Sequence, residues 1–211
     1  TETLTNLSTG SVVTASDFEY DATSRVISEM SASESKTFEW GANGKISKMT
    51  NGTGAPMRET IYTYNSNGAL TGEQRNHPYS NIVEARYEYM YFTDHYEERF
   101  YNIDNEMFRN LYYYTPDKKN IEKVVNYYGM DTSLGSKEYL YDNKIGVETL
   151  APYSQFPQPF RNANNVVTTT NKNSSNVITS TSDSVIEYDA LGHPTAIASG
   201  SYKRSFDYLI K

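Results

Sequence analysis

The residues of this chain that are best suited to bind a ligand are aromatic. Eleven aromatic side chains fall between Tyr87 and Tyr114. Because successive side chains of a strand point to opposite faces, one buried face cannot hold all of them, and some must be exposed. Exposed tyrosine rings stack on sugars and form protein interfaces at a small entropy cost. Tyr91, Tyr96 and Tyr101 are therefore candidate ligand-binding residues. The alternative, which we favour, is that tyrosine replaces leucine in a wide thin sheet, with its hydroxyls reaching solvent.

A second group of candidate residues lies in a segment at about residues 150–165 that is rich in proline and aromatic residues. The segment holds three prolines, Pro152, Pro157 and Pro159. Since proline cannot donate a hydrogen bond within a sheet, we predict a long ordered loop and not a central strand. Its aromatic residues Tyr153, Phe156 and Phe160 are further candidates for ligand binding. Loops of this length rim a ligand cleft or plug the open end of a barrel, and we expect a plug.

Acid-base and metal chemistry are less well supported. The densest group of titratable residues is Asp94-His95-Tyr96-Glu97-Glu98. On a strand, His95 and Glu97 share one face while Asp94, Tyr96 and Glu98 share the other, which is short of the three or four ligands that a metal needs. We therefore expect a solvated acidic turn and no metal or other cofactor. A glycosidase needs only two carboxylates at a suitable separation, and the sequence cannot identify such a pair.

Charge, hydropathy and known motifs exclude several classes of protein. The 211 residues include 19 basic and 26 acidic side chains, a formal charge of −7. Because no basic stripe is present, we expect no nucleic-acid partner. The mean hydropathy of −0.70 and the lack of a long apolar run argue against a membrane-spanning helix. The sequence has no cysteine and no serine-triad, P-loop or dinucleotide-binding signature, and we assign no catalytic residue.

The composition favours strands throughout. Tyrosine occurs 20 times, and aromatic and β-branched residues fit a pleated, half-buried surface. At the end of the chain, one face of the predicted strand holds Tyr202, Arg204, Phe206, Tyr208 and Ile210, and the other holds Lys203, Ser205 and Asp207, which is the pattern of a strand with one buried side. The best helical candidate, residues 120–126, is too short, so we expect little helix. Glu and Lys interrupt most strands on both faces, and we therefore also predict that the chain does not span a membrane as an outer-membrane barrel.

A repeated unit organises these strands. The unit is an aromatic or apolar residue, any residue, an aromatic residue and a turn residue, followed by a second short strand. Its copies start at Phe18, Phe38, Tyr62, Tyr87, Tyr112, Tyr139, Ile186 and Phe206, with a degenerate ninth copy at Thr168–Asn171. Asp and Asn after the aromatic residue can accept hydrogen bonds from the backbone two residues on, and Gly accepts positive φ, as at Gly44, Gly68 and Gly192. Each unit is thus a β-hairpin.

These hairpins predict an all-β fold. We expect one domain over residues 1–211, an up-and-down antiparallel meander of roughly 16–18 short strands that forms a curved sheet or a barrel-like structure. A propeller is disfavoured, because a blade needs about 40–45 residues in a stricter repeat.

Two resemblances follow from these residues. Residues 188–197, Tyr-Asp-Ala-Leu-Gly-His-Pro-Thr-Ala-Ile, resemble the tyrosine-aspartate (YD, or Rhs-type) repeat, and residues 18–27 are the next-best match. The whole chain is similar to a secreted bacterial domain family of unknown function whose fold has been called porin-like. Both resemblances imply an exported protein of the cell surface or periplasm, and a lipid anchor upstream of Thr1 is compatible with that location.

We therefore expect a non-catalytic binding or structural module of an exported bacterial cell-envelope protein, whose partner is a glycan or another envelope protein. The first alternative is a carbohydrate-active hydrolase with an unidentified carboxylate pair. The second is a structural spacer that binds nothing. The oligomeric state is left open by the sequence.

Overall fold

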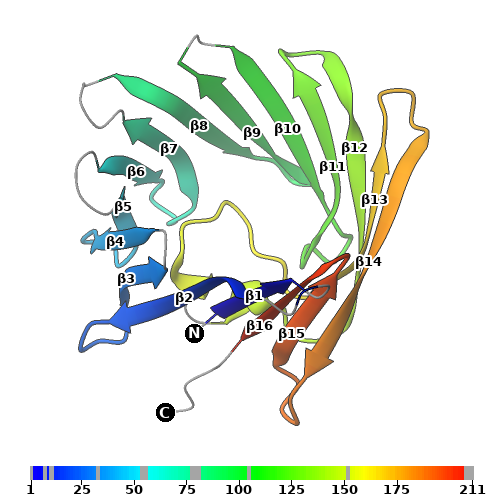
Figure 1. The fold of residues 1–211 in the computed structure, drawn as a ribbon. Helices are drawn as coiled ribbons and strands as arrows, with labels where there is room; N and C mark the ends of the chain where they lie inside the picture. Colours follow the sequence, from blue (N-terminus) through cyan, green and yellow to red (C-terminus); the bar gives the residue numbers. More distant parts are fainter. Residues whose placement is uncertain are drawn as a thin grey trace.

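The computed structural model describes residues 2–6, 9, 12–31, 34–52, 57–76, 82–103, 106–150 and 153–206, and these form sixteen β-strands (Figure 1). The strands are β1 (Glu2–Asn6), β2 (Val12–Tyr20), β3 (Val26–Ser31), β4 (Ser35–Trp40), β5 (Ile46–Asn51), β6 (Arg58–Tyr64), β7 (Leu70–Asn76), β8 (Val83–Tyr91), β9 (His95–Asn102), β10 (Met107–Tyr114), β11 (Ile121–Tyr128), β12 (Thr132–Tyr141), β13 (Val166–Lys172), β14 (Ile178–Tyr188), β15 (Pro194–Ser199) and β16 (Tyr202–Phe206).

Each strand pairs antiparallel with the strand that precedes it, in one sheet. The sheet curls until β1 hydrogen-bonds to both β2 and β16, so the strands form a closed barrel. At this joint Glu2 is in register with Phe206 on one side and with Ser16 on the other. The predicted all-β antiparallel meander and its number of strands are confirmed.

Side chains of the repeated unit form its tight turns as predicted. The Asp21 carboxylate accepts hydrogen bonds from the backbone N–H groups of Thr23 (2.8 Å) and Arg25 (3.0 Å). Asn65 and Asp189 each accept the equivalent pair from the residues two and four positions on. The turns also use positive φ, with Gly44 at 70°, Gly68 at 77° and Gly192 at 83°. The turn residue thus replaces backbone partners that the end of a strand would otherwise lack.

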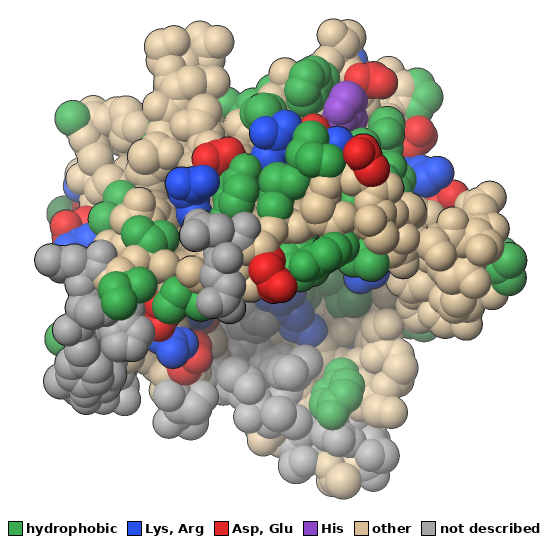
Figure 2. All heavy atoms as spheres, turned by 90° about the horizontal axis from the view of Figure 1, so that it is seen from above, with side chains coloured by type: hydrophobic (Ala, Val, Ile, Leu, Met, Phe, Trp, Pro, Cys, Tyr) green, Lys and Arg blue, Asp and Glu red, His purple; other side chains and the backbone are tan. Residues whose placement is uncertain are grey.

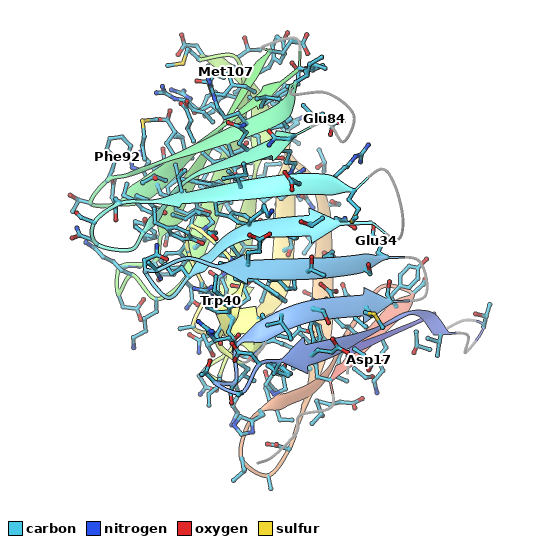
Figure 3. The ribbon with its side chains drawn as sticks, turned by 90° about the vertical axis from the view of Figure 1, so that its left-hand side faces the viewer. Asp17, Glu34, Trp40, Glu84, Phe92 and Met107 are labelled. Atoms are coloured by element: carbon cyan, nitrogen blue, oxygen red, sulfur yellow. The ribbon has the colours of Figure 1, made fainter. Side chains whose placement is uncertain are left out.

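These turns lie at one end of the barrel. Figure 3 shows Trp40 and Phe92 toward that end, and Glu34 and Glu84 toward the other. The degenerate copy at Thr168–Asn171 differs from the series, because its turn at residues 173–177 joins β13 to β14 at the opposite end. The preceding copy of the repeated unit, which starts at Tyr139 in β12, is followed by the long segment 142–165 in place of a tight turn. The doubled spacing in the sequence therefore marks a long connection and not a lost hairpin.

The core occupies the same end, on the inner face of the sheet. Among the described residues, the larger buried cluster consists of Leu70, Tyr89, Tyr96, Ile121 and Val124, and partly buried tyrosines pack against it. A second cluster consists of Val26, Phe38 and Ile46. The core therefore combines buried aliphatic side chains with a surrounding layer of partly buried tyrosine rings.

Helix is nearly absent, as expected. Within the described ranges the helical segments are two single 3₁₀ turns, Val147–Thr149 and Tyr153–Gln155, and residues 121–126 belong to β11. None of the described helices has the length and apolar character that crossing a membrane requires. The terminal strand is observed from Tyr202 to Phe206, and the part of the prediction beyond Phe206 lies outside the described residues.

Candidate functional site

The connection between β12 and β13 lies inside the turn-bearing end of the barrel (Figure 1, yellow). We call residues 142–165 the plug segment; Ala151 and Pro152 lie outside its described part. Gln155 ties it to the far wall, because its Oε1 accepts from the Val26 N–H (2.6 Å) and its Nε2 donates to the Ser24 carbonyl (3.0 Å). The segment therefore spans the barrel from β12 to the turn between β2 and β3.

Aromatic rings of the plug segment cover both core clusters. Phe156 packs 5.3 Å from Phe38 and 6.1 Å from Phe18, measured between ring centroids. Phe160 packs 5.1 Å from Tyr114. These contacts close the core at this end against solvent.

Asparagine amides hold the returning half of the plug segment. Asn162 Oδ1 accepts from the Ile121 N–H (2.8 Å) and from the Tyr141 hydroxyl (3.0 Å). Asn165, only 4% exposed, accepts from the Val147 N–H (3.0 Å) and donates to the Ile145 carbonyl (2.9 Å). The buried backbone groups of an irregular segment thereby gain the partners that a strand would supply.

Most of the residues predicted to bind a ligand meet at this plugged end. The Tyr91 hydroxyl donates to the Leu70 carbonyl (2.6 Å) and lies 3.3 Å from the Pro159 carbonyl, and burial raises the pKa of Tyr91 to about 12. Tyr96 is 5% exposed and stacks on Tyr112 at 4.3 Å. The plug segment itself contains the other three rings, those of Tyr153, Phe156 and Phe160. All five residues make structural contacts here, and their role in ligand binding stays a prediction.

The sixth predicted residue, Tyr101, lies apart from the others on the outer wall. The Arg86 guanidinium lies 4.5 Å above its ring, and its hydroxyl is 3.5 Å from Glu88. Figure 2 looks onto this side of the molecule, where hydrophobic and charged side chains are mixed. The surplus of aromatic residues in this region is thus divided between the two faces of the sheet, as alternation requires.

A pocket of about 690 Å³ opens on the inner wall formed by β8 to β13, toward the end of the barrel away from the plug segment. We call it the interior pocket. Tyr87, Phe100 and Phe108 form its aromatic wall, with ring centroids 4.8 Å apart between Tyr87 and Phe100 and 6.0 Å apart between Phe100 and Phe108. Three neighbouring strands therefore present a continuous row of rings to the same space.

A chain of hydrogen bonds runs beside these rings. Asn126 Nδ2 donates to Asn110 Oδ1 (2.7 Å), and Asn110 Nδ2 donates to Glu98 Oε1 (2.8 Å). The Tyr112 hydroxyl donates to the same Glu98 oxygen (3.2 Å). Within the described ranges no group donates to Glu98 Oε2, which leaves this oxygen as an acceptor for a ligand. Burial raises the pKa of Glu98, and the nearby Glu73 carboxylate raises it further.

Glu73 in β7 is the carboxylate whose charge acts on Glu98. Glu73 is held by Arg75 (2.8 Å), whose guanidinium also lies 5.0 Å from the Tyr87 ring. Only Glu98 lines the interior pocket. The signal in the sequence was the predicted alternation in β9, which correctly set Tyr96 and Glu98 on one face. The sequence did not contain the strand register that brings Glu73 close to Glu98.

The solvated acidic turn expected at residues 94–98 is wrong, because His95–Asn102 form strand β9 and Tyr96 and Glu97 are only 5% and 6% exposed. By alternation, His95 and Glu97 lie on the outer face of this strand. His95 Nδ1 lies 2.8 Å from Asp94 Oδ1, and the His95 ring stacks on Phe92. Glu97 Oε1 forms an ion pair with Arg99 Nε (2.5 Å). The described part of the chain contains no group of three or more histidine, aspartate or glutamate side chains that could hold a metal ion.

Comparison with known proteins gives a fold but no family. A porin-like protein from Bacteroides uniformis is similar over 97% of this chain and 94% of its own, with a TM-score of 0.61 and 12% identity. A porin-like protein from Bacteroides vulgatus is similar over 98% and 97%, with a TM-score of 0.47 and 12% identity. No family model matches this chain, and no curated protein does. The chain therefore shares a porin-like β fold, and its resemblance to tyrosine-aspartate repeats stays a prediction.

Proposed function

We propose that this chain is a non-catalytic binding module whose interior pocket takes a carbohydrate. The observation that carries the proposal is the combination of an aromatic row, Tyr87, Phe100 and Phe108, with the polar chain that ends at Glu98, in one pocket. A sugar ring has an apolar face that stacks on aromatic side chains and hydroxyls that both donate and accept. The pocket offers a partner for each.

The size and position of the pocket support the same ligand class. Its volume of about 690 Å³ lies within the range of about 300–1,000 Å³ that is usual for small-molecule sites. The plug segment fills the opposite end, so a ligand reaches the rings from the other mouth of the barrel. An extended saccharide is suited to such a one-sided opening, because one end can be bound while the rest stays in solvent.

The setting that we propose is the bacterial cell envelope, with the chain exported to the surface or the periplasm and tethered there by a lipid anchor. The support is the similarity of fold to the porin-like Bacteroides protein and the resemblances stated from the sequence. Glycans are abundant in that setting, and another envelope protein is the alternative partner.

Isothermal titration calorimetry against a panel of bacterial and host oligosaccharides tests the proposal. We expect at least one to bind the parent chain, and Phe100→Ala to weaken that binding about fivefold or more, because stacking of a ligand on an aromatic ring contributes about 1–3 kcal/mol. The matched control is Phe92→Ala, which removes an exposed ring from the outside of the barrel. Circular dichroism of each variant establishes that the sheet is intact.

Two results would contradict the proposal. The first is that no oligosaccharide binds the parent chain. The second is that Phe100→Ala binds as tightly as the parent, while Phe156→Ala does not, which would move the site to the plugged end.

The pair Glu98 and Glu73 favours one alternative, a carbohydrate-active hydrolase, since the raised pKa of Glu98 is what a general acid needs. The ion pair of Glu73 with Arg75 favours a non-catalytic function, because the Glu73 carboxylate already has a partner. Release of reducing sugar ends by the parent chain, lost in Glu98→Gln, would establish the hydrolase.

A further inference from the structure

The interior pocket contains a cation that has no protein partner. Lys137 in β12 lines the pocket and is in register with the buried Val124 on one side and with Asn171, also in the pocket lining, on the other. Its strand position therefore faces the interior. Across the residues that the structure describes, the Lys137 ammonium forms no hydrogen bond and no ion pair, and its side chain is exposed to the pocket solvent.

Two other cations at inward-facing strand positions are paired with a carboxylate. Lys36 pairs with Glu29 at 3.0 Å, and Arg75 pairs with Glu73 at 2.8 Å. The neighbouring lysine, Lys172, has its ammonium 2.7 Å from Glu138. The chain has seven more acidic than basic residues, so acidic partners are not scarce. Lys137 differs from these three cations in having no carboxylate partner among the residues that the structure describes.

The unpaired Lys137 ammonium places a positive charge beside aromatic and polar side chains that can bind the rest of a ligand, which an isolated surface lysine does not. The net charge of −7 repels anions over the rest of the surface. An anionic ligand would thus be accepted here and rejected elsewhere.

We propose that the saccharide taken by the interior pocket is an acidic one, whose carboxylate or sulfate group binds the Lys137 ammonium while a sugar ring stacks on Phe100 and Phe108. This inference rests on the proposed carbohydrate-binding function and adds the chemical class of the ligand. In this arrangement Glu98 Oε2 accepts a hydrogen bond from a hydroxyl group of the sugar. The ionised acid group of the ligand has no proton to donate, so it does not bind Glu98.

The test compares each acidic saccharide with its neutral counterpart by calorimetry. The carboxylated probes are trigalacturonic acid against its methyl ester, and 3′-sialyllactose against lactose. The sulfated probe is 3′-sulfolactose against lactose, which separates sulfate from carboxylate recognition. We expect at least one acid to bind at least tenfold more tightly than its counterpart, and this preference to shrink as sodium chloride is raised from 50 to 500 mM.

The variant Lys137→Gln should remove the preference, so that the acidic saccharide and its neutral counterpart bind this variant with similar affinity. The control is Lys123→Gln, which changes a lysine of the adjacent strand that is in register with Glu138 and Tyr113 on the outer wall. It should keep the full preference. Because both substitutions are at positions with access to solvent, neither should unfold the sheet, and circular dichroism checks this.

The outcomes separate the two proposals. If neutral and acidic saccharides bind equally and Lys137→Gln binds as the parent does, the acidic ligand is excluded while the carbohydrate site stands. If no saccharide of either kind binds, the carbohydrate site fails and the acidic ligand fails with it. If the preference is lost equally in both lysine variants, it arises from general charge and not from the pocket.

Discussion

Asn120 and Asn164 hydrogen-bond to each other twice. Asn120 Nδ2 donates to Asn164 Oδ1 (3.0 Å), and the backbone N–H of Asn164 donates to Asn120 Oδ1 (3.0 Å). Asn120 ends the turn between β10 and β11 and is only 6% exposed, while Asn164 belongs to the plug segment. One buried amide thus joins the barrel wall to the segment that fills its end.

Replacing Asn120 with Ala should destabilise the fold by about 2–3 kcal/mol, because both hydrogen bonds are lost and a buried N–H is left without a partner. The measurement is the free energy of unfolding in urea. Asn120→Asp is the control that separates the two bonds, since it keeps an acceptor for the Asn164 N–H and loses the donor. An equal cost for Ala and Asp would contradict this assignment.

The aromatic contacts of the plug segment predict a second loss of stability. Phe156→Ala should cost about 3 kcal/mol, the usual range for removing a large ring from a packed site. Leu191→Ala, at a turn residue that is 70% exposed, should change stability by less than about 0.5 kcal/mol. If Phe156→Ala unfolds at the same urea concentration as the parent, the plug segment does not cover the core.

The repeated turns can be tested at Asn65. Asn65→Ala removes the acceptor of two backbone N–H groups, each at 3.0 Å, and should cost about 1–2 kcal/mol. Asn65→Asp should be nearly neutral, because aspartate plays the same part at positions 21 and 189. Thermal unfolding of the three proteins decides the point, and a cost for Asp as large as that for Ala would show that the side-chain acceptor is not what stabilises the turn.

The bulge beside the interior pocket requires glycine. Gly135 has φ of 122°, and an added Cβ would lie 2.3 Å from the Lys172 carbonyl. Gly135→Ala should therefore destabilise by about 2 kcal/mol or more and weaken saccharide binding. Gly129→Ala is the matched control, because Gly129 also has positive φ (63°) but has open space around it, so only about 1 kcal/mol is expected. Equal losses would mean that the close approach is relieved by a shift of β13.

The buried carboxyl of Glu98 predicts how stability depends on pH. Its pKa in the folded chain is raised above its ordinary value of 4.5, mainly by burial, so the folded state holds the proton more tightly than the unfolded state does. As pH rises above about 4.5, ionisation of this carboxyl therefore lowers the free energy of unfolding. Glu98→Gln keeps an acceptor for Asn110 and Tyr112 and should raise the melting temperature at pH 7. The gain should vanish below about pH 4, and a gain of equal size at both pH values would contradict it.

Local features of this fold could be predicted from the sequence, and the reason is that their causes are local. Asp21, Asn65 and Asp189 stabilise their turns through residues two and four positions away, so the sequence contains both partners. The alternation in β9 likewise placed Glu98 on the face of Tyr96. The strand count followed from the number of hairpins.

The candidate site could not be predicted in the same way. The interior pocket depends on the register of the six strands β8 to β13, which brings Tyr87 beside Phe100. The pairing of β7 with β8 then brings Glu73 close to Glu98. No spacing along the chain encodes these relationships, since the residues of a pair are separated by a turn whose length varies. For the same reason the sequence could not tell whether residues 150–165 rim a cleft or fill the barrel; the contacts of Gln155 and Phe156 place them inside.

The topology of the barrel also predicts the order in which its strands pair during folding. Every pair except β1 with β16 joins strands that are consecutive along the chain, so most of the barrel can grow by adding one hairpin to the next at low loop-closure entropy. The pairing of Glu2 with Phe206 brings together residues from opposite ends of the chain and has to wait until the sheet between them has curled. This seam is only five residues long, and we expect it to form last during folding and to open first in native-state hydrogen exchange.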